Sequence, residues 1–392
     1  MQEIIETYLE KYLPRKDIIH RLPVSLPISK VWPELQKARK DKSESLPLLS
    51  IDGKPFWWVL TQSISSQADE VISLARREIV FDRPEYEEAF REAVLDEAVY
   101  SSVIEGAFTT KKEAREFIHE GRSPKNKSEQ MVKNNFEALT YVLEHIDESI
   151  TEQTIFDIYA LVTKDTLEAD VPTNAYRSES VFVQSSRGEI VHTAPEAEKV
   201  PGMMASLLEF ITNNELSPLI KACIAHFYFV YVHPFIDGNG RTARALSFMM
   251  LLQAGYDFFR YFSISGVIAE ERAKYYKAIK DVEDDDFDMT YFIDYYTGML
   301  ARAVKAMEER LVDKVVMEQT LDKLKAAGMN KRIIEGAKWI LTSPNQSITI
   351  KAWQKKFGVV LETARQDLFK LEDAGIVHRK LVKRQYVFEV KK

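Results

Sequence analysis

The chain has 392 residues, of which 45% are hydrophobic and 29% are charged, and its formal net charge is −7. This composition is typical of a globular protein with a sizeable apolar core and two to three domains. A single cysteine, Cys223, excludes a disulfide framework and favours a reducing compartment. No apolar run approaches the roughly 20 residues that span a bilayer, and the charged N-terminus lacks the apolar stretch of a signal peptide. We therefore expect a cytoplasmic protein that does not bind or span a membrane.

Residues 1–70 contain several prolines and few helical repeats, which predicts extended segments that wrap around a core. From residue 67 to about residue 313, apolar residues recur at intervals of three and four, and this periodicity predicts amphipathic helices. Helices are therefore expected to dominate the fold.

One of these helices is predicted over residues 83–105, and Gly106 follows it directly. Glycine at this position commonly ends a helix, so the sequence by itself favours an ordinary helix end. Ser101 and Glu105 lie four residues apart and therefore share one face of the predicted helix.

A short hairpin is predicted over residues 176–192. Its apolar residues alternate on both sides of a Ser-Ser-Arg-Gly turn, a pattern that is typical of two antiparallel strands. The hairpin interrupts a chain that is otherwise helical, and a surface hairpin without a function is one open interpretation of it.

Residues 233–244 bring together the residue types of an anion-handling site. His233 can accept a proton near neutral pH, and the Asp237 carboxylate suits a hard cation such as Mg²⁺. A Gly-Asn-Gly run lets backbone N–H groups converge on a phosphate, while Arg241 and Arg244 supply forked donors for phosphate oxygens. Strong helix formers follow, so the run is expected at a helix N-terminus, which favours bound anions. The pattern predicts transfer of part of a nucleotide.

Two other interpretations of this segment compete with nucleotide transfer. Its glycines, with Ala243 and Asp257 after them, also fit a dinucleotide-binding fingerprint if a strand precedes them. Apolar residues between 219 and 231 instead recur at intervals of three and four residues, which predicts a helix before the motif. The dinucleotide-binding fingerprint also does not require a histidine at position 233. A glycine-rich loop with incidental charges is the second alternative. A P-loop is excluded, because the pattern GxxxxGK(S/T) does not occur.

At these residues the sequence resembles the Fic family, because residues 233–244 meet its signature HxFx(D/E)GNGRxxR at every position. The resemblance extends over roughly residues 65–300. It implies an enzyme that binds ATP and Mg²⁺ and transfers AMP to a hydroxyl group of a target protein. Family members that replace the second glycine by lysine phosphorylate instead, so Gly240 favours nucleotidyl transfer.

The resemblance also implies a role for each motif residue. His233 would act as the general base, Phe235 would anchor the loop in the core, and Asp237 would hold Mg²⁺. Arg241 and Arg244 would bind the outer phosphates. The nucleotide site would comprise Asp237, Gly238, Asn239, Gly240, Arg241, Thr242, Arg244, Tyr275 and Tyr276. The two tyrosines would line the adenine pocket. The alternative interpretation is that both are ordinary residues of the hydrophobic core.

Ser101, Glu105 and Gly106 match the inhibitory-helix signature of the family, (S/T)xxxE(G/N). The resemblance implies that Glu105 pairs with Arg244 and occupies the space that the γ-phosphate needs. A carboxylate in an anion site competes with a phosphate for the same guanidinium. The resting protein is therefore expected to be inhibited by its own helix.

The predicted hairpin resembles the flap of the family, whose exposed strand edge holds a target segment by main-chain pairing. In this chain the docking edge would consist of Val183, Gln184, Ser185 and Ser186. Such pairing would place a target hydroxyl without recognising much of the side-chain sequence around it.

Residues 330–392 form a separate unit in the sequence. Helices are predicted over residues 331–341, 350–357 and 362–374, and two strands follow, an order that resembles the winged-helix fold. Residues 351–392 hold 11 Lys and Arg against 5 Asp and Glu. Such basic charge indicates nucleic acid. The third helix, however, carries several acidic residues, and four of the cations lie in the wing that the two strands form, at Arg379, Lys380, Lys383 and Arg384. Docking of a protein or dimerisation is the default interpretation, and contact with DNA stays open.

We therefore predict a mainly α fold with a Fic-type helical bundle, a short β-hairpin flap and a small C-terminal winged helix-turn-helix. The predicted parts are an N-terminal region with the inhibitory helix, a catalytic core, a linker helix and a winged-helix domain, at residues 1–110, 111–313, 314–329 and 330–392. ATP, an unidentified target protein and a second copy of the chain are the expected partners, and self-modification is a further expectation. The alternative functions are removal of AMP from a modified protein by the same site, and a nucleotide-sensing DNA-binding regulator.

Overall fold

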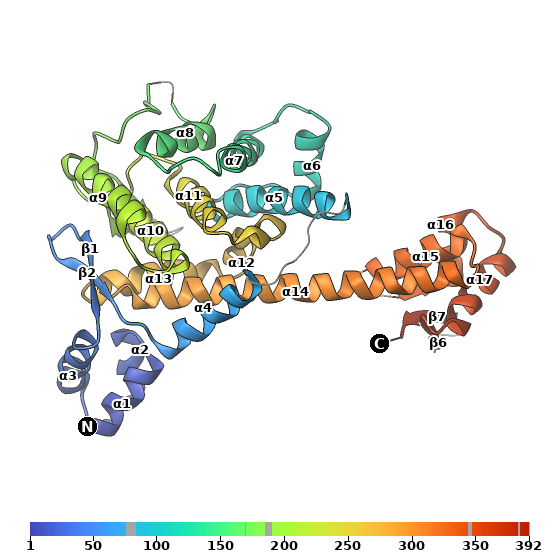
Figure 1. The fold of residues 1–392 in the computed structure, drawn as a ribbon, viewed down its shortest axis with the longest axis horizontal. Helices are drawn as coiled ribbons and strands as arrows, with labels where there is room; N and C mark the ends of the chain where they lie inside the picture. Colours follow the sequence, from blue (N-terminus) through green and yellow to red (C-terminus); the bar gives the residue numbers. More distant parts are fainter. Residues whose placement is uncertain (76–83, 169, 185–189, 344–346, 383–384, 392) are drawn as a thin grey trace. The chain divides into compact units, whose positions relative to one another are not determined.

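The computed structural model describes residues 1–392 except residues 76–83, 169, 185–189, 344–346, 383–384 and 392. The chain divides into two compact units, Met1–Lys305 and Ala306–Lys392. Helices dominate both units (Figure 1), and the strands of the described residues form three small sheets. The mainly α fold predicted from the sequence is confirmed, while the predicted boundaries between its parts stay predictions.

The first part of the chain is more regular than predicted. It forms α1 (Gln2–Lys11), α2 (Arg15–Ile19), α3 (Ile28–Lys40), β1 (Glu44–Leu49), β2 (Pro55–Trp58) and α4 (Gln62–Ala75). The prediction of extended segments over residues 1–70 is therefore wrong. Pro14 and Pro27 contributed to it, but they are the N-cap residues of α2 and α3, where a missing N–H breaks no helical hydrogen bond.

The N-terminal helices pack on a small core of their own. Its buried residues are Tyr8, Ile18, Trp32 and Leu35. Arg39 of α3 is also buried and joins these helices to α14 (Thr290–Ala326), because its guanidinium donates to the Tyr291 hydroxyl at 2.6 Å. The same guanidinium donates to the backbone carbonyls of Tyr8 and Leu13, at 3.2 and 3.0 Å.

Two buried helices form the centre of the first unit, α10 (Pro218–Val232) and α11 (Asn239–Gln253), which lie side by side (Figure 1). Buried residues occur on every side of α10, as is typical of a helix surrounded by protein. Because α10 precedes the motif where the dinucleotide fingerprint needs a strand, that alternative is excluded. No helix of the described part of the chain is both long enough and apolar enough to cross a membrane.

Further helices surround this pair. They are α5 (Pro84–Ile104), α6 (Lys111–His119), α7 (Lys127–Glu144), α8 (Glu152–Thr163), α9 (Val200–Asn213), α12 (Ile264–Glu270) and α13 (Arg272–Asp284), with the short 3-10 helices η1 (Ala197–Lys199) and η2 (Asp257–Tyr261). Side-chain caps fix several helix starts, because Asn126, Thr151 and Ser217 accept N–H groups in the first turns of α7, α8 and α10. α5, α7 and α8 pack against α11, and α9 packs against α10.

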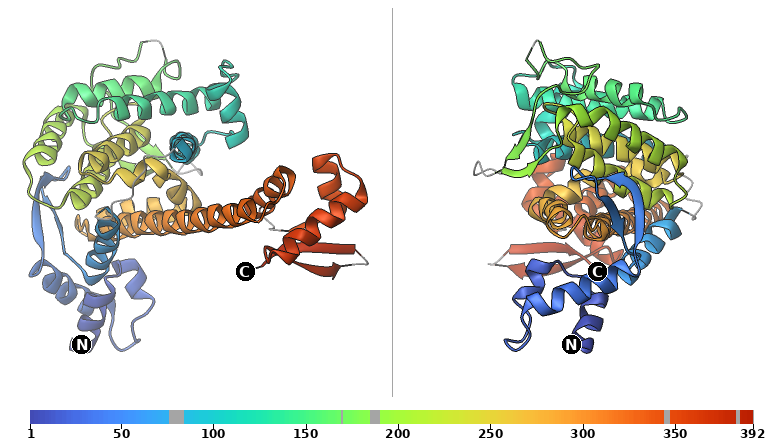
Figure 2. Two further views of the ribbon diagram at one scale, coloured as in Figure 1. Left: turned by 45° about the vertical axis from the view of Figure 1, so that its right-hand side comes forward. Right: turned by 90° about the vertical axis from the view of Figure 1, so that its left-hand side faces the viewer.

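Two antiparallel hairpins complete the first unit. In the first, Glu44 of β1 lies opposite Trp58 of β2, and β1 packs against α9 (Figure 2). The second consists of β3 (Phe182–Gln184) and β4 (Ile190–Thr193), with Phe182 opposite Thr193. The hairpin predicted over residues 176–192 is therefore present, although its turn lies outside the described residues.

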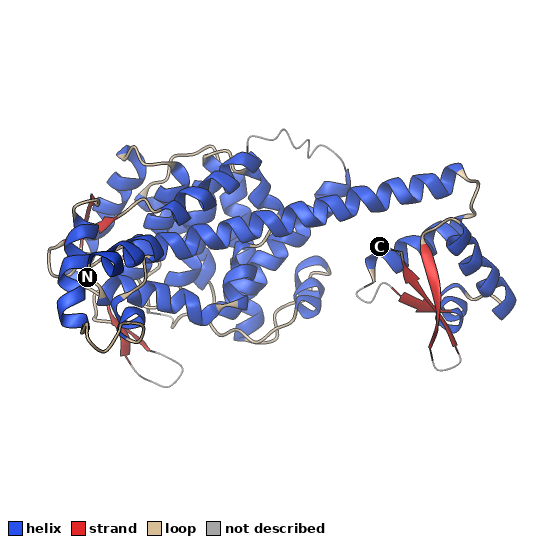
Figure 3. Ribbon diagram, turned by 90° about the horizontal axis from the view of Figure 1, so that it is seen from below, coloured by secondary structure: helices blue, strands red, loops and turns tan. Residues whose placement is uncertain are grey.

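The second unit contains the last part of α14, then α15 (Lys331–Thr342), β5 (Ser347–Thr349), α16 (Ile350–Phe357), α17 (Leu361–Asp373), β6 (Val377–Val382) and β7 (Gln385–Val390). β7 pairs with both β5 and β6, and β5 was not predicted (Figure 3). Gly358, at φ 62°, ends α16 and makes the turn toward α17. The order of elements agrees with a winged helix, which stays a prediction.

Candidate functional site

The motif residues lie in the turn between α10 and α11. α10 ends at Val232, and His233 adopts a left-handed conformation (φ 50°, ψ 59°) in which its N–H donates to the Phe229 carbonyl at 3.0 Å. Gly238, at φ 81°, directly precedes α11. A Cβ at Gly238 would lie 2.7 Å from Thr163 Cγ2, so both the backbone conformation and the space require glycine there.

The His233 imidazole is partly buried, and its Nδ1 lies 3.2 Å from the Val230 carbonyl oxygen. A carbonyl only accepts, so Nδ1 carries the proton in this contact, and Nε2 of the neutral ring keeps its lone pair. Burial lowers the pKa of His233 to about 4. The turn thus provides a neutral base with a defined tautomer at physiological pH.

Phe235 anchors the turn in the core. Its ring is buried and stacks on Tyr159 of α8, with ring centroids 3.6 Å apart. Asn239 closes the loop, because its Oδ1 accepts from the Phe235 N–H at 2.9 Å and its Nδ2 donates to the Phe235 carbonyl at 2.8 Å. The Asn239 side chain therefore stabilises the loop. An anion at the first turn of α11 could be bound by the backbone N–H of Asn239 but not by its side chain.

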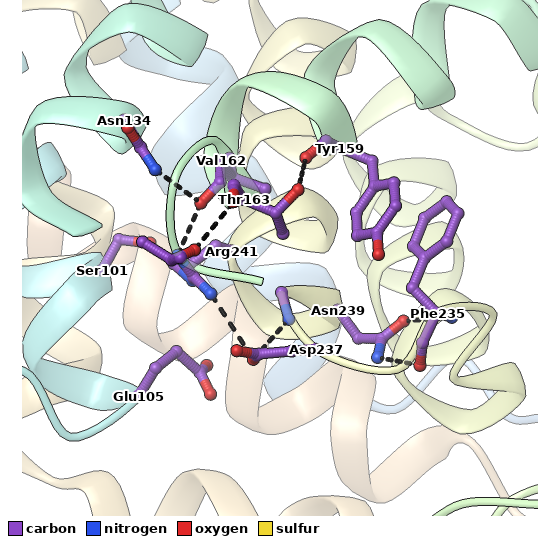
Figure 4. A network of polar contacts seen from close by, with 12 residues as sticks. Ser101, Glu105, Asn134, Tyr159, Val162, Thr163, Phe235, Asp237, Asn239 and Arg241 are labelled. Atoms are coloured by element: carbon purple, nitrogen blue, oxygen red, sulfur yellow. Dashed lines mark hydrogen bonds and ion pairs between the residues drawn. The ribbon is translucent and has the colours of Figure 1, made fainter. Parts of the chain in front are cut away.

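Asp237 lies on the open side of the loop, with its side chain 47% exposed. Its Oδ1 accepts from the Gly238 N–H at 2.6 Å and lies 3.4 Å from Arg241 Nη2. The Arg241 guanidinium is fully buried and donates from Nη1 to the Val162 carbonyl at 2.6 Å (Figure 4). The contacts of Arg241 in the structure join α8 to the loop and to Asp237, and the role in binding outer phosphates that the resemblance implied for it stays a prediction.

Arg244, one turn further along α11, has a side chain that is only 2% exposed. Its Nε donates to Ser101 Oγ at 2.8 Å, and its Nη2 donates to the Ser101 carbonyl at 2.8 Å and to Glu105 Oε1 at 2.9 Å. Arg244 Nη1 and the Thr242 hydroxyl are buried and have no hydrogen-bond partner among the described residues. A buried, unpaired guanidinium N–H is a strong donor for an anion.

Glu105 directly follows α5, and Gly106 after it, at φ 92°, turns the chain away from the helix. The carboxylate reaches the first turn of α11 at Gly240. A Cβ at Gly240 would lie 2.2 Å from Glu105 Oε1 and 3.2 Å from Arg244 Nη1. The absence of a side chain at Gly240 therefore provides the space that the Glu105 carboxylate occupies.

Comparison with known proteins assigns a family to part of the chain. Residues 149–251, which contain α8, α10, the turn and most of α11, match the family described as Fic/DOC. The chain contains a Fic domain. The resemblance that the motif predicted is thereby confirmed.

Curated relatives of this Fic domain are named protein adenylyltransferase Fic. The relative from Nematostella vectensis is 30% identical over 208 residues, which cover 50% of this chain and 45% of the relative. The relative from Drosophila willistoni is 27% identical over 207 residues, which cover 50% of this chain and 39% of the relative. The chain thus matches less than half the length of these curated relatives.

Solved structures agree with this assignment of the fold. A Fic family protein from Desulfovibrio desulfuricans G20 has a TM-score of 0.56 at 22% identity, over 85% of this chain and 98% of that chain. Fic-1 from C. elegans has a TM-score of 0.50 at 20% identity, over 63% of this chain and 71% of that chain. At these identities the likeness concerns the fold alone.

The two tyrosines expected in the adenine pocket of the Fic domain differ in their surroundings. Tyr275 is buried, and its hydroxyl lies 2.9 Å from Nε2 of His226. Tyr276 is half-buried, and the Arg272 guanidinium lies 5.5 Å from its ring centroid. Burial and the nearby Glu105 carboxylate raise the pKa of Tyr276. Tyr275 therefore packs in the core, whereas Tyr276 is partly open to solvent.

The predicted flap of the Fic domain is described in part. Val183 and Gln184 lie in β3, whereas Ser185 and Ser186 lie outside the described residues. Within the described part of the chain β3 pairs with β4 alone, so no other strand covers its second edge. An edge of this kind can accept an added strand.

Arg177 is a further residue of this site that the sequence pattern did not single out. Its buried side chain donates to the carbonyls of His233 and Val232. Backbone carbonyls belong to every residue type, so such contacts produce no pattern in the sequence. The position of Arg177 at the start of the predicted hairpin was the available signal.

The residues fit a Mg²⁺ ion that binds together with a nucleotide. Among the described residues, no group of three or more His, Cys, Asp and Glu side chains could hold a metal ion. Mg²⁺ commonly uses one or two carboxylates together with substrate phosphates. The partly exposed Asp237 carboxylate, beside the first turn of α11, has this chemistry.

Proposed function

We propose that the Fic domain transfers AMP from ATP to the hydroxyl group of a Ser, Thr or Tyr side chain in a target protein. The observation that carries the proposal is the turn that presents the neutral His233 imidazole and the Asp237 carboxylate beside the start of α11. A base, a metal-binding carboxylate and a helix N-terminus are suited to transfer of a phosphate-containing group. The name shared by the curated relatives supports the same reaction.

In the proposed reaction, His233 Nε2 takes the proton of the target hydroxyl while the hydroxyl oxygen bonds to the α-phosphorus of ATP. The bond from the α-phosphorus to the bridging oxygen breaks, and pyrophosphate leaves with the electron pair. The Val230 carbonyl holds Nδ1–H throughout, so it stabilises the imidazolium that forms. The proton later leaves His233 for solvent.

The phosphates of ATP would lie against the first turn of α11, whose N–H groups have no acceptor within the helix. Gly240 gives access to this turn, and Arg244 offers its unpaired Nη1. Asp237, oriented by Arg241, would hold Mg²⁺, which neutralises phosphate charge when bound.

We further propose that Glu105 inhibits the resting protein. Its carboxylate contacts the Arg244 guanidinium and lies against Gly240, and both of these contacts would otherwise be made by a phosphate. A phosphate that lies against Gly240 and binds Arg244 Nη2 must therefore displace the carboxylate first. The target segment would dock by main-chain pairing on the open edge of β3, with self-modification as one outcome.

The test is to incubate the Glu105→Gly variant with Mg²⁺ and each of ATP, GTP, UTP and CTP, and to measure mass shifts on the protein and in a lysate. We expect addition of AMP with ATP. His233→Ala in the same background should lower the rate about 10²–10⁴-fold and leave the Kd of ATP nearly unchanged, because the base acts on the target hydroxyl. His145→Ala, which changes a histidine at the end of α7, is the matched control and should keep the parental rate. A parental rate in the His233→Ala variant would contradict the mechanism.

The surface of the C-terminal unit supports contact with nucleic acid as a second function. Asp367, one of the acidic residues predicted on the third helix, is buried and accepts from Arg332 Nε at 2.7 Å. The guanidinium groups of Arg365 and Arg379 lie 5.2 and 4.9 Å from the ring centroid of Phe369. The surface of α17 is therefore less acidic than the sequence indicates, and it combines cations with an aromatic ring, as nucleic-acid sites do.

A further inference from the structure

Arg177 is a buried cation that is surrounded by backbone carbonyls. It is 5% exposed, and every hydrogen bond of its side chain to another described residue ends on a carbonyl oxygen. Burial lowers the pKa of its guanidinium. Burying a charge is costly unless it is paired or hydrogen-bonded, so this arrangement indicates a specific role for the contacts that Arg177 makes.

One set of contacts holds the turn after α10. Arg177 Nε donates to the His233 carbonyl at 2.8 Å, and Nη2 lies 3.4 Å from the Val232 carbonyl. The backbone N–H of Arg177 donates to the Pro234 carbonyl at 2.9 Å. A single residue thus binds three consecutive carbonyls at the start of the motif.

These contacts bear on the orientation of the His233 ring. His233 has a positive φ of 50°, which side-chain-bearing residues adopt only where the surrounding structure holds them. Its ring is fixed by the contact from Nδ1 to the Val230 carbonyl, at 3.2 Å, so the direction of Nε2 follows the backbone at residue 233. A shift of that backbone would move the base.

The second set of contacts holds the stem of the β3–β4 hairpin. Arg177 Nη1 donates to the Glu179 carbonyl, which precedes β3, at 2.7 Å. Nη2 donates to the Pro195 carbonyl, which follows β4. Because the guanidinium is a planar, rigid fork, the same group fixes the hairpin stem and the His233 turn relative to each other.

We propose that Arg177 is a positioning residue that sets the His233 imidazole relative to the β3–β4 hairpin, and thereby to the hydroxyl of a docked target segment. The inference rests on the proposed function, in which the hairpin edge holds that segment. Its consequence is that Arg177 acts on the rate of transfer and leaves the binding of ATP unaffected.

Two substitutions separate the effect of the positive charge of Arg177 from the effect of its forked shape. Arg177→Lys keeps the cation but lacks the fork, whereas Arg177→Gln loses the cation. Burial is the main cause of the low pKa of His233, and of the ionisable groups that act on it, His192 and Arg177 lower this pKa while Glu105 raises it. As the pH is lowered, the rate of AMP addition should therefore begin to fall at a higher pH in Arg177→Gln than in the parent. In Arg177→Lys this pH should be unchanged.

The experiment uses the full chain with Glu105→Gly as the parent. We would measure the rate of AMP addition to the protein itself at saturating ATP and Mg²⁺, the Kd of ATP by calorimetry, and the melting temperature. Arg177→Lys should lower the rate by about 10- to 100-fold, as misplacement of a reacting group does, with the Kd of ATP within about twofold of the parent.

Arg39→Lys is the matched control, because Arg39 is also a buried arginine that donates to two backbone carbonyls, in the N-terminal helices. It should lower the melting temperature and leave the rate of AMP addition unchanged. A folded Arg177→Lys variant with the parental rate would overturn the inference while the proposed function stands. If the parent adds no AMP, the proposed function fails and this inference fails with it. If Arg177→Gln does not fold, Arg177→Lys decides.

Discussion

Glu105 Oε1 lies 2.9 Å from Arg244 Nη2, although 139 residues separate the two in the sequence. Ser101 lies in α5, the helix that ends just before Glu105. Its hydroxyl and its backbone carbonyl both accept hydrogen bonds from the same guanidinium. The end of α5 therefore binds most of the donors that Arg244 could offer to a phosphate. This relationship connects the end of α5 to the motif turn.

Gly240→Ala should destabilise the wild-type protein through Glu105. The added Cβ would lie 2.2 Å from Glu105 Oε1, so the carboxylate must move and lose its contact with Arg244. The loss of such a charged hydrogen bond costs about 1–3 kcal/mol. In the Glu105→Gly background the same substitution should cost clearly less. Chemical denaturation of the four proteins measures this coupling, and an equal cost in both backgrounds would contradict the geometry.

The rate of AMP transfer should resist mild acid. A base works only while its imidazole is neutral, and burial lowers the pKa of His233 to about 4, so the ring stays neutral when an ordinary histidine is half protonated. We predict that kcat/KM of the Glu105→Gly variant changes little between about pH 7 and pH 5.5 and falls at lower pH. The check is a rate profile against pH with the folded state monitored, and a midpoint near 6.5 would argue against a buried base at this position.

Asn239→Ala should loosen the motif turn. The Asn239 side chain satisfies both backbone groups of buried Phe235, at 2.9 and 2.8 Å, and its removal leaves them unpaired. Each unpaired buried group costs about 1–3 kcal/mol, so the free energy of unfolding should fall by at least about 1 kcal/mol. The measurement is equilibrium denaturation. Full stability in a variant that has lost activity would indicate instead that the side chain serves the nucleotide.

Neutralising the basic wing tests the second function. If residues 330–392 bind DNA through phosphates, replacing Arg379, Lys380, Lys383 and Arg384 by glutamine should weaken binding and reduce its salt slope by about 1 per lost phosphate contact. Fluorescence anisotropy with a duplex at several salt concentrations measures both quantities. Binding that is absent from the wild type, or unchanged in the variant, would favour docking of a protein at this unit.

The sequence predicted those parts of the fold and site that depend on local patterns. The helical periodicity before the motif correctly excluded a strand, because α10 buries residues on all sides. The motif residues are contiguous, so their place between two helices followed from the glycines and the helix formers after them. The proximity of Glu105 to Arg244 is a long-range contact, and only the resemblance to the Fic family indicated it.

Other features could not be predicted because backbone groups or tertiary packing decide them. The carbonyl partners of Arg177 have no signature in the side chains of the sequence. The hydrogen bonds from the Asn239 side chain to the backbone of Phe235 also have no signature in the sequence. Prolines in the N-terminal region looked like helix breaks, but Pro14 and Pro27 begin helices. β5 has three residues, too few to show an alternating pattern.

The most direct test of autoinhibited AMP transfer is the rate of AMP addition by wild-type protein, Glu105→Gly, and Glu105→Gly/Arg244→Ala at equal ATP and Mg²⁺, with folding verified for each. We predict that Glu105→Gly is faster than wild type by at least about tenfold, because freeing one charged hydrogen-bond donor for the phosphate corresponds to about 1.5 kcal/mol or more. The double variant should lose that gain. A folded Glu105→Gly variant that transfers AMP no faster than wild type would contradict the account, and loss of an ability to remove AMP from a modified protein would make Glu105 a catalytic residue of the reverse reaction.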